Sequence, residues 1–146
     1  MTIVVGYPTN RRAKAVLSLA SMLARSTGDD MVVCTAIRDP RVPGMFRDDP
    51  GFRSYVDELA EAALARARED VPMDVGVQFT RIDARSIATG LIQAAEKYDA
   101  SVIVVGSAMG RIEQVTVSSI ADRLLHSSPI PVAVAPRGFR AAGGKV

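Results

Sequence analysis

Short apolar runs alternate with longer amphipathic segments along the chain, and this alternation restricts the fold more than any other feature of the sequence. The short runs are apolar almost without a break, which is typical of strands that are buried on both faces. The longer segments repeat apolar residues at three- and four-residue spacing, which is typical of helices. We therefore expect five strands, at residues 2–6, 31–37, 74–81, 101–105 and 131–135.

A helix is expected in each interval between these strands. The first helix should begin at Asn10 and end at Arg25, with Gly28 just beyond it as a stop signal. A long loop that contains three prolines should precede the second helix. The loop and the other three helices are expected at residues 38–53, 56–67, 87–95 and 119–126. Asp83 is expected to cap the third helix, and Asp99 to lie in the turn before the fourth strand.

Strands that alternate with helices form a parallel sheet with right-handed crossovers and helices on both faces. The expected fold is therefore an α/β doubly wound open sandwich, with a five-stranded parallel sheet of order 3-2-1-4-5 and two helices on each face. In this order the winding reverses between strands 1 and 4, and ligands bind at such a reversal. The loops that follow these two strands, at residues 6–12 and 106–119, are the expected place for a site.

Composition limits the domain count and the partners. A chain of 146 residues, of which 48% are hydrophobic, can enclose one core, so we expect one domain over residues 1–146 with a loose tail at 137–146. The net charge is only +2, aromatic residues make up 5%, and no block of lysine and arginine occurs, which argues against a nucleic-acid partner. No apolar stretch approaches the roughly 20 residues of a membrane span, and no secretion signal begins the chain. A cytoplasmic protein without a membrane partner is expected.

Catalytic and metal chemistry have little support in this sequence. A single cysteine, Cys34, and a single histidine, His126, cannot supply a disulfide or a zinc site, so no metal is expected. Cys34 lies within a predicted buried strand and is typical of a small core residue. His126 ends the fourth predicted helix, where a capping or surface role fits. Because no nucleophile has a base in reach, we do not expect an enzyme.

The two loops at the reversal point allow both a structural and a functional interpretation. Two cations, Arg11 and Arg12, near the start of the first helix are unfavourable unless a phosphate, a surface carboxylate or solvent balances them. In the second loop, Gly106 and Gly110 let a backbone approach a ligand, and a following serine can donate to a phosphate. Equally, Gly106 can simply end a strand while the serine caps a helix. The residues alone leave both interpretations open.

The sequence resembles the universal stress protein family from end to end. The resemblance is carried by "IVVGYPTNRRAKAVLSLA", "MVVCTAIRDP", "DASVIVVGS" and "VSSIADRLLHSSPIPVAVAPRG", and the last quarter is its most specific part. Members that bind ATP or AMP carry Gly-x2-Gly-x9-Gly-Ser/Thr after the fourth strand, and an Asp that closes the first strand and contacts adenine. The resemblance therefore implies a role in the stress response and a site for an adenine nucleotide.

This chain departs from the nucleotide-binding pattern in both loops. Its glycines form Gly-x3-Gly, Ser118 takes the place of the third glycine, and Ser119 supplies the hydroxyl. The stretch from Gly106 to Ser118 is one residue shorter than the family pattern. Tyr7 stands where the adenine-contacting Asp is expected, and its ring could stack on a base or fill the pocket and close it. In favour of an anion, Arg11, Arg12 and Arg111 are expected near one mouth.

The resulting interpretation is a regulatory module of the stress response, either ligand-independent or with an altered nucleotide site. The alternative is a sensor protein that binds ATP or AMP, the two candidate cofactors. Family members hydrolyse ATP slowly, but nothing in this sequence positions a water, so no hydrolysis is predicted. The residues expected at the nucleotide site are Tyr7, Pro8, Thr9, Arg11, Ile37, Gly106, Met109, Gly110, Arg111, Ser118 and Ser119.

The last predicted strand would lie at an edge of the sheet. An apolar edge with unpaired N–H and C=O groups favours pairing with another chain, and Pro131 and Pro136 limit the length of such pairing. The resemblance implies a homodimer that forms through this strand, with Val132 and Val134 near the two-fold axis. The alternative is that the tail at 137–146 folds back and covers the edge.

Overall fold

The computed structural model describes residues 1–38, 50–107 and 119–140. Five parallel strands form one sheet in the order β3-β2-β1-β4-β5, which confirms the predicted fold. The strands and helices are, in chain order, β1 (Thr2–Gly6), α1 (Lys14–Thr27), β2 (Asp30–Arg38), α2 (Pro50–Asp70), β3 (Val77–Ala84), α3 (Ile87–Lys97), β4 (Ala100–Gly106), α4 (Ser119–Ser127) and β5 (Val132–Ala135).

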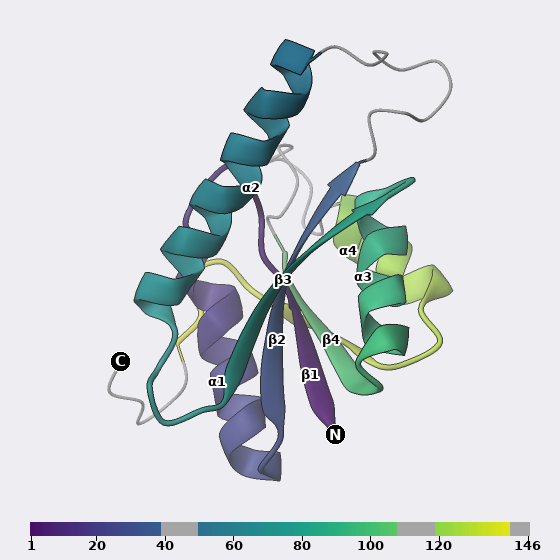
Figure 1. The fold of residues 1–146 in the computed structure, drawn as a ribbon. Helices are drawn as coiled ribbons and strands as arrows, with labels where there is room; N and C mark the ends of the chain where they lie inside the picture. Colours follow the sequence, from purple (N-terminus) through teal and green to yellow (C-terminus); the bar gives the residue numbers. More distant parts are fainter. Residues whose placement is uncertain (39–49, 108–118, 141–146) are drawn as a thin grey trace.

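The helices cover both faces of the sheet in pairs, α1 with α2 and α3 with α4 (Figure 1). Successive residues of a strand point to opposite faces, so Ile3 and Val5 of β1 pack under α1 and α2, whereas Val4 packs under α3 and α4. All three side chains are at most 1% exposed. Within the three described ranges, no helix is long and apolar enough to cross a membrane.

Helix α1 begins at Lys14, four residues later than the sequence predicted. Residues 8–13 form an irregular segment, and Ala13 at the N-cap has a non-helical backbone, with φ −132° and ψ 73°. Arg11 and Arg12 therefore precede the helix and do not occupy its first turn, so the expected conflict with the helix dipole does not arise. The helix ends at Thr27, two residues later than predicted, and Gly28 follows it as the predicted stop, in a left-handed conformation with φ 80°.

Strand β3 begins at Val77 and ends at Ala84, three residues later along the chain than predicted, and Asp74 lies in the loop before it. Both Nε and Nη2 of Arg25, at the end of α1, donate to the Asp74 carboxylate at 2.8 and 3.0 Å. Pairing with β2 then begins at Val77, opposite Met31. Asp83 consequently lies inside β3 and not at a helix cap. Ser86 caps α3 instead, with its hydroxyl accepting from the N–H of Thr89.

The loop between β2 and α2 was predicted to extend from residue 38 to residue 53, and this prediction was too long at both ends. Strand β2 includes Arg38, and α2 begins at Pro50. Proline suits the first position of a helix because its fixed φ is helical and the N–H that it lacks would be unpaired there. Asp99, in the predicted turn before β4, has a positive φ of 52°.

A glycine sets how closely α3 packs on the sheet. A Cβ built on Gly90 would lie 3.0 Å from Cβ of Ala36 in β2 and 3.3 Å from Cβ of Ala84 in β3. These neighbours are short side chains fixed to sheet backbone, so they cannot move aside without displacing a strand. The start of α3, which borders the site described below, therefore depends on glycine at this position.

Replacing Gly90 with valine should destabilise the protein by about 2 kcal/mol, since overpacking of a close contact costs about 1–3 kcal/mol. The measurement is the free energy of unfolding in urea. The matched control is Gln93→Val, which places the same β-branched residue at an exposed position of the same helix. Equal stability of the two variants would contradict the close approach of α3 to β2.

Candidate functional site

A hollow of about 140 Å³ lies where the segment after β1 meets the starts of α3 and α4. It is adjacent to the reversal of winding between β1 and β4, where the fold was expected to place a site. Among the described residues, those that line it are uncharged, and they are Tyr7, Pro8, Thr9, Asn10, Ala36, Ile87 and Ile120. The polar side chains of Thr9 and Asn10 thus come from one wall, and apolar groups form the others.

Tyr7 contributes to this hollow from the core of the protein. Its side chain is 1% exposed and packs in the cluster under α1 and α2. The hydroxyl accepts a hydrogen bond from the N–H of Ala13 at 3.1 Å, and the backbone N–H donates to the carbonyl of Cys34 at 2.9 Å. A ring held in this way is part of the packing beneath the loop, so it does not offer an open face for a base to stack on.

The three arginines that were expected at one mouth are not shown to converge. Arg12 turns to α2, where Nη1 donates to Asp70 at 2.7 Å and Nη2 to Glu69 at 2.9 Å. Hydrogen bonds to Asp70 and Glu69 raise the pKa of the Arg12 guanidinium. A surface carboxylate pair therefore balances this cation, which was one of the alternatives left open by the sequence. Arg11 is exposed, and Arg111 lies outside the described residues.

Gly106 ends β4, and its lack of a side chain has a packing reason. A Cβ at this position would lie 3.0 Å from Cγ2 of Val16 in α1. The glycine therefore lets the end of β4 pass close beneath α1, whatever the loop after it binds. Ile37, near the end of β2, is 8% exposed and is not among the described residues that line the hollow.

The other expected residues at the nucleotide site lie in or next to the second loop. Met109, Gly110, Arg111 and Ser118 fall outside the described residues, and Ser119 is the first residue of α4. On the edge strand β5, where a dimer contact was expected, Val132 and Val134 are half-buried and pack against the cluster under α3 and α4. None of these placements tests a ligand or a second chain, so the roles of these residues remain predictions.

Four residues of the hollow were not singled out from the sequence, namely Asn10, Ala36, Ile87 and Ile120. Asn10 was assigned to a helix that in fact begins four residues later. Ile87 is the first residue of α3, and Ile120 is the second residue of α4. Both could have been singled out from the sequence, because ligands in such folds bind near the start of a helix that follows a strand. Ala36 resembles any core residue of a buried strand and carries no such signal.

The start of α3 at the rim of the hollow is capped by its own side chains. Ser86 accepts from the N–H of Thr89 at 3.1 Å, and its hydroxyl donates to Oγ1 of Thr89 at 2.9 Å. An N–H group that would otherwise attract an anion is therefore already paired. Together with the uncharged lining, this favours a neutral part of a ligand in the hollow.

Neither reactive side chain singled out in the sequence lies in the hollow's described lining. Cys34 is fully buried in β2, and burial raises the pKa of its thiol to about 12. A thiol with such a pKa stays protonated at neutral pH and is a poor nucleophile. His126 lies in the last turn of α4 with Nδ1 2.9 Å from the carbonyl oxygen of Asp122, and its side chain is exposed.

The family model of universal stress proteins matches residues 1–136. The chain belongs to the universal stress protein family. Universal stress proteins of Mycobacterium bovis (Mb2346c) and Mycobacterium tuberculosis (Rv2319c) are each 36% identical to it over 145 residues. The alignment covers 96% of this chain and 50% of each relative, so the chain spans about half the length of the curated relatives it matches.

Solved universal stress proteins share the fold. A universal stress protein from Archaeoglobus fulgidus in complex with dAMP superposes with a TM-score of 0.62 at 22% identity, over 92% of this chain and 97% of that one. A universal stress protein in complex with cAMP gives a TM-score of 0.62 at 17% identity, over 93% of this chain and 96% of that one. Both comparisons show that this chain shares their fold.

The Tyr7 hydroxyl should stabilise the loop that forms one wall of the hollow. Replacing Tyr7 with phenylalanine leaves the ring in place but deprives the N–H of Ala13 of its acceptor, which should lower the free energy of unfolding by about 1 kcal/mol. Urea unfolding measures this loss. Tyr55→Phe is the control, because Tyr55 is 57% exposed on α2. A Tyr7→Phe variant as stable as the wild type would show that this hydrogen bond contributes nothing.

Proposed function

We propose that the chain is a regulatory module of the stress response whose nucleotide site is altered, so that it takes the adenosine part of a nucleotide and grips the phosphate weakly. The observation that carries this proposal is the small uncharged hollow beside β1, which has polar groups on one wall and apolar groups on the others. Such a lining suits a flat heterocycle with a hydrogen-bonding edge.

Asn10 is the side chain of the hollow best suited to recognise that edge. A carboxamide carries both donors and an acceptor, and asparagine can pair with N6 and N7 of adenine through two hydrogen bonds. Ala36, Ile87 and Ile120 supply apolar surface for the faces of the ring. Support for an adenine ligand also comes from two relatives of the same fold, described as complexes with dAMP and cAMP.

Several features support a weakened grip on phosphate. The glycine pattern after β4 is Gly-x3-Gly, with Ser118 in the third glycine position. Arg12 is paired with carboxylates on α2, and the cap at Ser86 occupies a donor at the start of α3. The hollow of about 140 Å³ is also well below the roughly 300–1,000 Å³ of a typical small-molecule site. A hollow of this size matches part of a nucleotide, and the rest of the ligand would extend beyond the described lining.

Calorimetric titration of nucleotide-free protein with adenosine, AMP and ATP tests this proposal. We expect the three dissociation constants to agree within about tenfold, because a phosphate that makes no strong contact adds at most about 1.4 kcal/mol. Asn10→Ala should weaken adenosine binding about fivefold, the scale of one hydrogen bond. Ser119→Ala should leave AMP binding unchanged within about twofold, since the phosphate makes only weak contacts.

Two other results would each overturn this function in favour of an alternative. AMP or ATP binding more than about a hundredfold tighter than adenosine, and weakened by Ser119→Ala, would identify a nucleotide sensor with a working phosphate loop. No heat with any of the three ligands at millimolar concentration would identify a ligand-independent module that acts through protein contacts.

We also propose that the chain forms one cytoplasmic domain and pairs through β5 into a homodimer. Strand β5 is at an edge of the sheet, and Val132 and Val134 on it are only half-buried. The described part of the C-terminal segment supports an accessible edge, because Phe139 packs into the cluster under α1 and α2.

Light scattering of the purified chain at micromolar concentration should give the mass of a dimer. Val134→Asp should give a monomer, because a charge at the pairing edge opposes association. Thr80→Asp on the other edge strand, β3, is the matched control and should leave the dimer intact. A wild-type monomer, or a dimer that survives Val134→Asp, would contradict pairing through β5.

A further inference from the structure

The wall of the hollow that carries its polar groups, Pro8 to Asn10, is held from behind by α2. Nη2 of Arg66 donates to the carbonyl oxygen of Thr9 at 2.9 Å, across 57 residues of sequence. Thr9 itself lines the hollow. This hydrogen bond therefore acts directly on the position of the wall.

The Arg66 guanidinium makes fewer hydrogen bonds along one edge than the guanidinium groups of two other arginines do. Nε and Nη2 form one edge of the guanidinium and can grip two oxygens side by side. In Arg25 this edge holds both oxygens of Asp74, and in Arg81 it holds both oxygens of Asp83. In Arg66 the same edge holds only Thr9, and Nε is buried without a hydrogen-bond partner among the described residues.

A second unpaired polar atom lies on the sheet face that α2 covers. The side chain of Thr35 in β2 is 0% exposed, and its hydroxyl lacks a partner within the described part of the chain. Thr35 is two residues after Val33 in the same strand, so both side chains point to the same face of the sheet. Val33 packs in the cluster under α1 and α2, and Thr35 therefore faces these helices too. One unpaired donor and one unpaired hydroxyl, which can accept, thus occupy the same side of the sheet.

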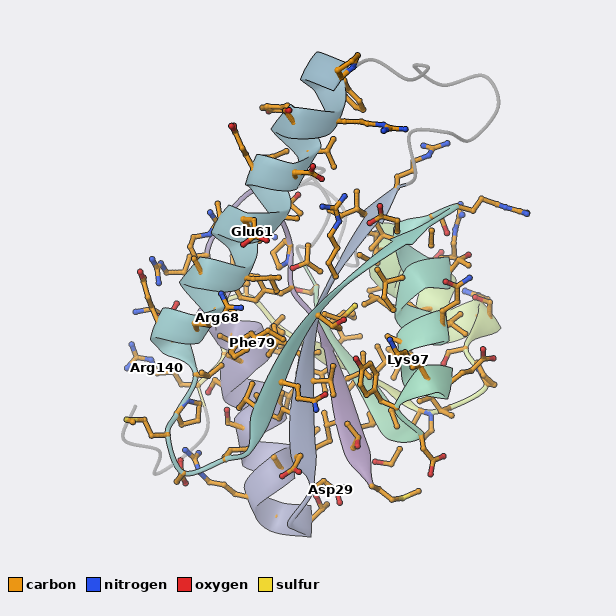
Figure 2. All side chains as sticks on the ribbon, viewed as in Figure 1. Asp29, Glu61, Arg68, Phe79, Lys97 and Arg140 are labelled. Atoms are coloured by element: carbon orange, nitrogen blue, oxygen red, sulfur yellow. The ribbon has the colours of Figure 1, made fainter. Side chains whose placement is uncertain are left out.

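The course of α2 brings these two groups to a similar level. Arg68 lies over the ring of Phe79, with its guanidinium carbon 4.9 Å from the ring centre (Figure 2). Phe79 pairs with Val33 in the adjacent strand. Because α2 runs antiparallel to β2 (Figure 1), Arg66 lies beyond Arg68 in the direction that leads from Val33 to Thr35. Arg66 is on the opposite flank of the helix from Arg68 and reaches Thr9. Tyr7, two residues before Thr9, donates its backbone N–H to the carbonyl of Cys34, the neighbour of Thr35.

Neither unpaired atom is explained by stability. A buried polar group without a partner destabilises the folded state, and an apolar side chain of similar shape would avoid this loss. Such groups in a folded protein call for another explanation. Their position behind the wall of the hollow supplies one.

We propose that Arg66 is a positioning residue for the hollow, which holds the Pro8–Asn10 wall through Thr9 and takes the Thr35 hydroxyl as its second acceptor when the hollow is occupied. This inference rests on the proposed function, because it assumes that a ligand presses on the wall. When a ligand binds, Nε of Arg66 donates to the Thr35 hydroxyl while Nη2 still donates to Thr9. These two hydrogen bonds connect α2 to the wall and to β2. Arg66 and Thr35 act through the wall and make no contact with the ligand.

The test uses two variants. Arg66→Met keeps the packing of the aliphatic part of the arginine side chain and removes the guanidinium. Thr35→Val keeps the branched shape of the threonine side chain and removes its hydroxyl. Adenosine binding should weaken about fivefold in each variant, the scale of one hydrogen bond. The double variant should bind no more weakly than Arg66→Met alone, because both changes remove the same interaction. Without ligand, Thr35→Val should melt at the same temperature as the wild type or higher.

Amide hydrogen exchange in the unliganded protein tests the position of the wall separately. The N–H of Ala13 donates a hydrogen bond to the Tyr7 hydroxyl. This N–H should exchange several times faster in Arg66→Met than in the wild type, because the loop before Ala13 loses its hydrogen bond to α2. Arg66→Lys, which can still donate to Thr9, should restore slow exchange. Arg25→Met is the control and should leave Ala13 unaffected, because Arg25 pairs with Asp74 before β3.

The positioning role of Arg66 and the role of Thr35 as second acceptor can be contradicted separately. Unchanged Ala13 exchange in Arg66→Met would overturn the positioning role, and it would do so even if the protein bound no adenosine at all. Wild-type adenosine affinity in Thr35→Val would overturn the second acceptor. A loss of affinity that merely follows a lower melting temperature in both variants would show a structural role only. Absence of adenosine binding to the wild type would refute the proposed function and, with it, the ligand-dependent role of Thr35.

Discussion

The central strands β1 and β4 are buried on both faces, and most of the architecture follows from this constraint. A strand that carries apolar side chains on both sides needs a layer of helices above and below the sheet. Between one strand and the next the chain therefore returns through a helix on one face of the sheet, which keeps all strands parallel and places their carboxyl ends along one edge. The winding reverses between β1 and β4, and the helices that follow these two strands, α1 and α4, lie in opposite layers (Figure 1). The hollow is a geometric result of this reversal.

Much of the fold could be predicted because burial on both faces leaves a clear mark in sequence. The runs at residues 2–6 and 101–105 contain almost only apolar residues, and both are central strands. Strand β3 was misplaced because it is an edge strand, half-buried along most of its length, whose polar and apolar residues alternate. The start of α1 was misplaced because Asn10, Arg11 and Arg12 are compatible with an exposed helical turn, and only the tertiary contact of Tyr7 with Ala13 shows otherwise.

The site was less predictable than the fold because its chemistry depends on pairs that are distant in sequence. The residues flanking β1 could be singled out by topology, as Tyr7, Pro8 and Thr9 were. Nothing local indicated that Arg12 would pair with Asp70, or that Arg66 would reach Thr9. The sequence predicts which face of a helix such as α2 is apolar. It does not predict which distant residues the polar side chains of that helix will contact, because this depends on how the helix packs on the sheet.

The close contact between Gly106 and Val16 has a consequence for how such loops are interpreted across relatives. Selection for packing alone would favour this glycine in a lineage that had stopped using nucleotides, because a Cβ at this position would lie only 3.0 Å from Cγ2 of Val16 in α1. A glycine at the end of β4 is therefore ambiguous as an evolutionary marker. Its persistence records the constraint of the scaffold, and the history of ligand use is better traced through residues that packing does not fix.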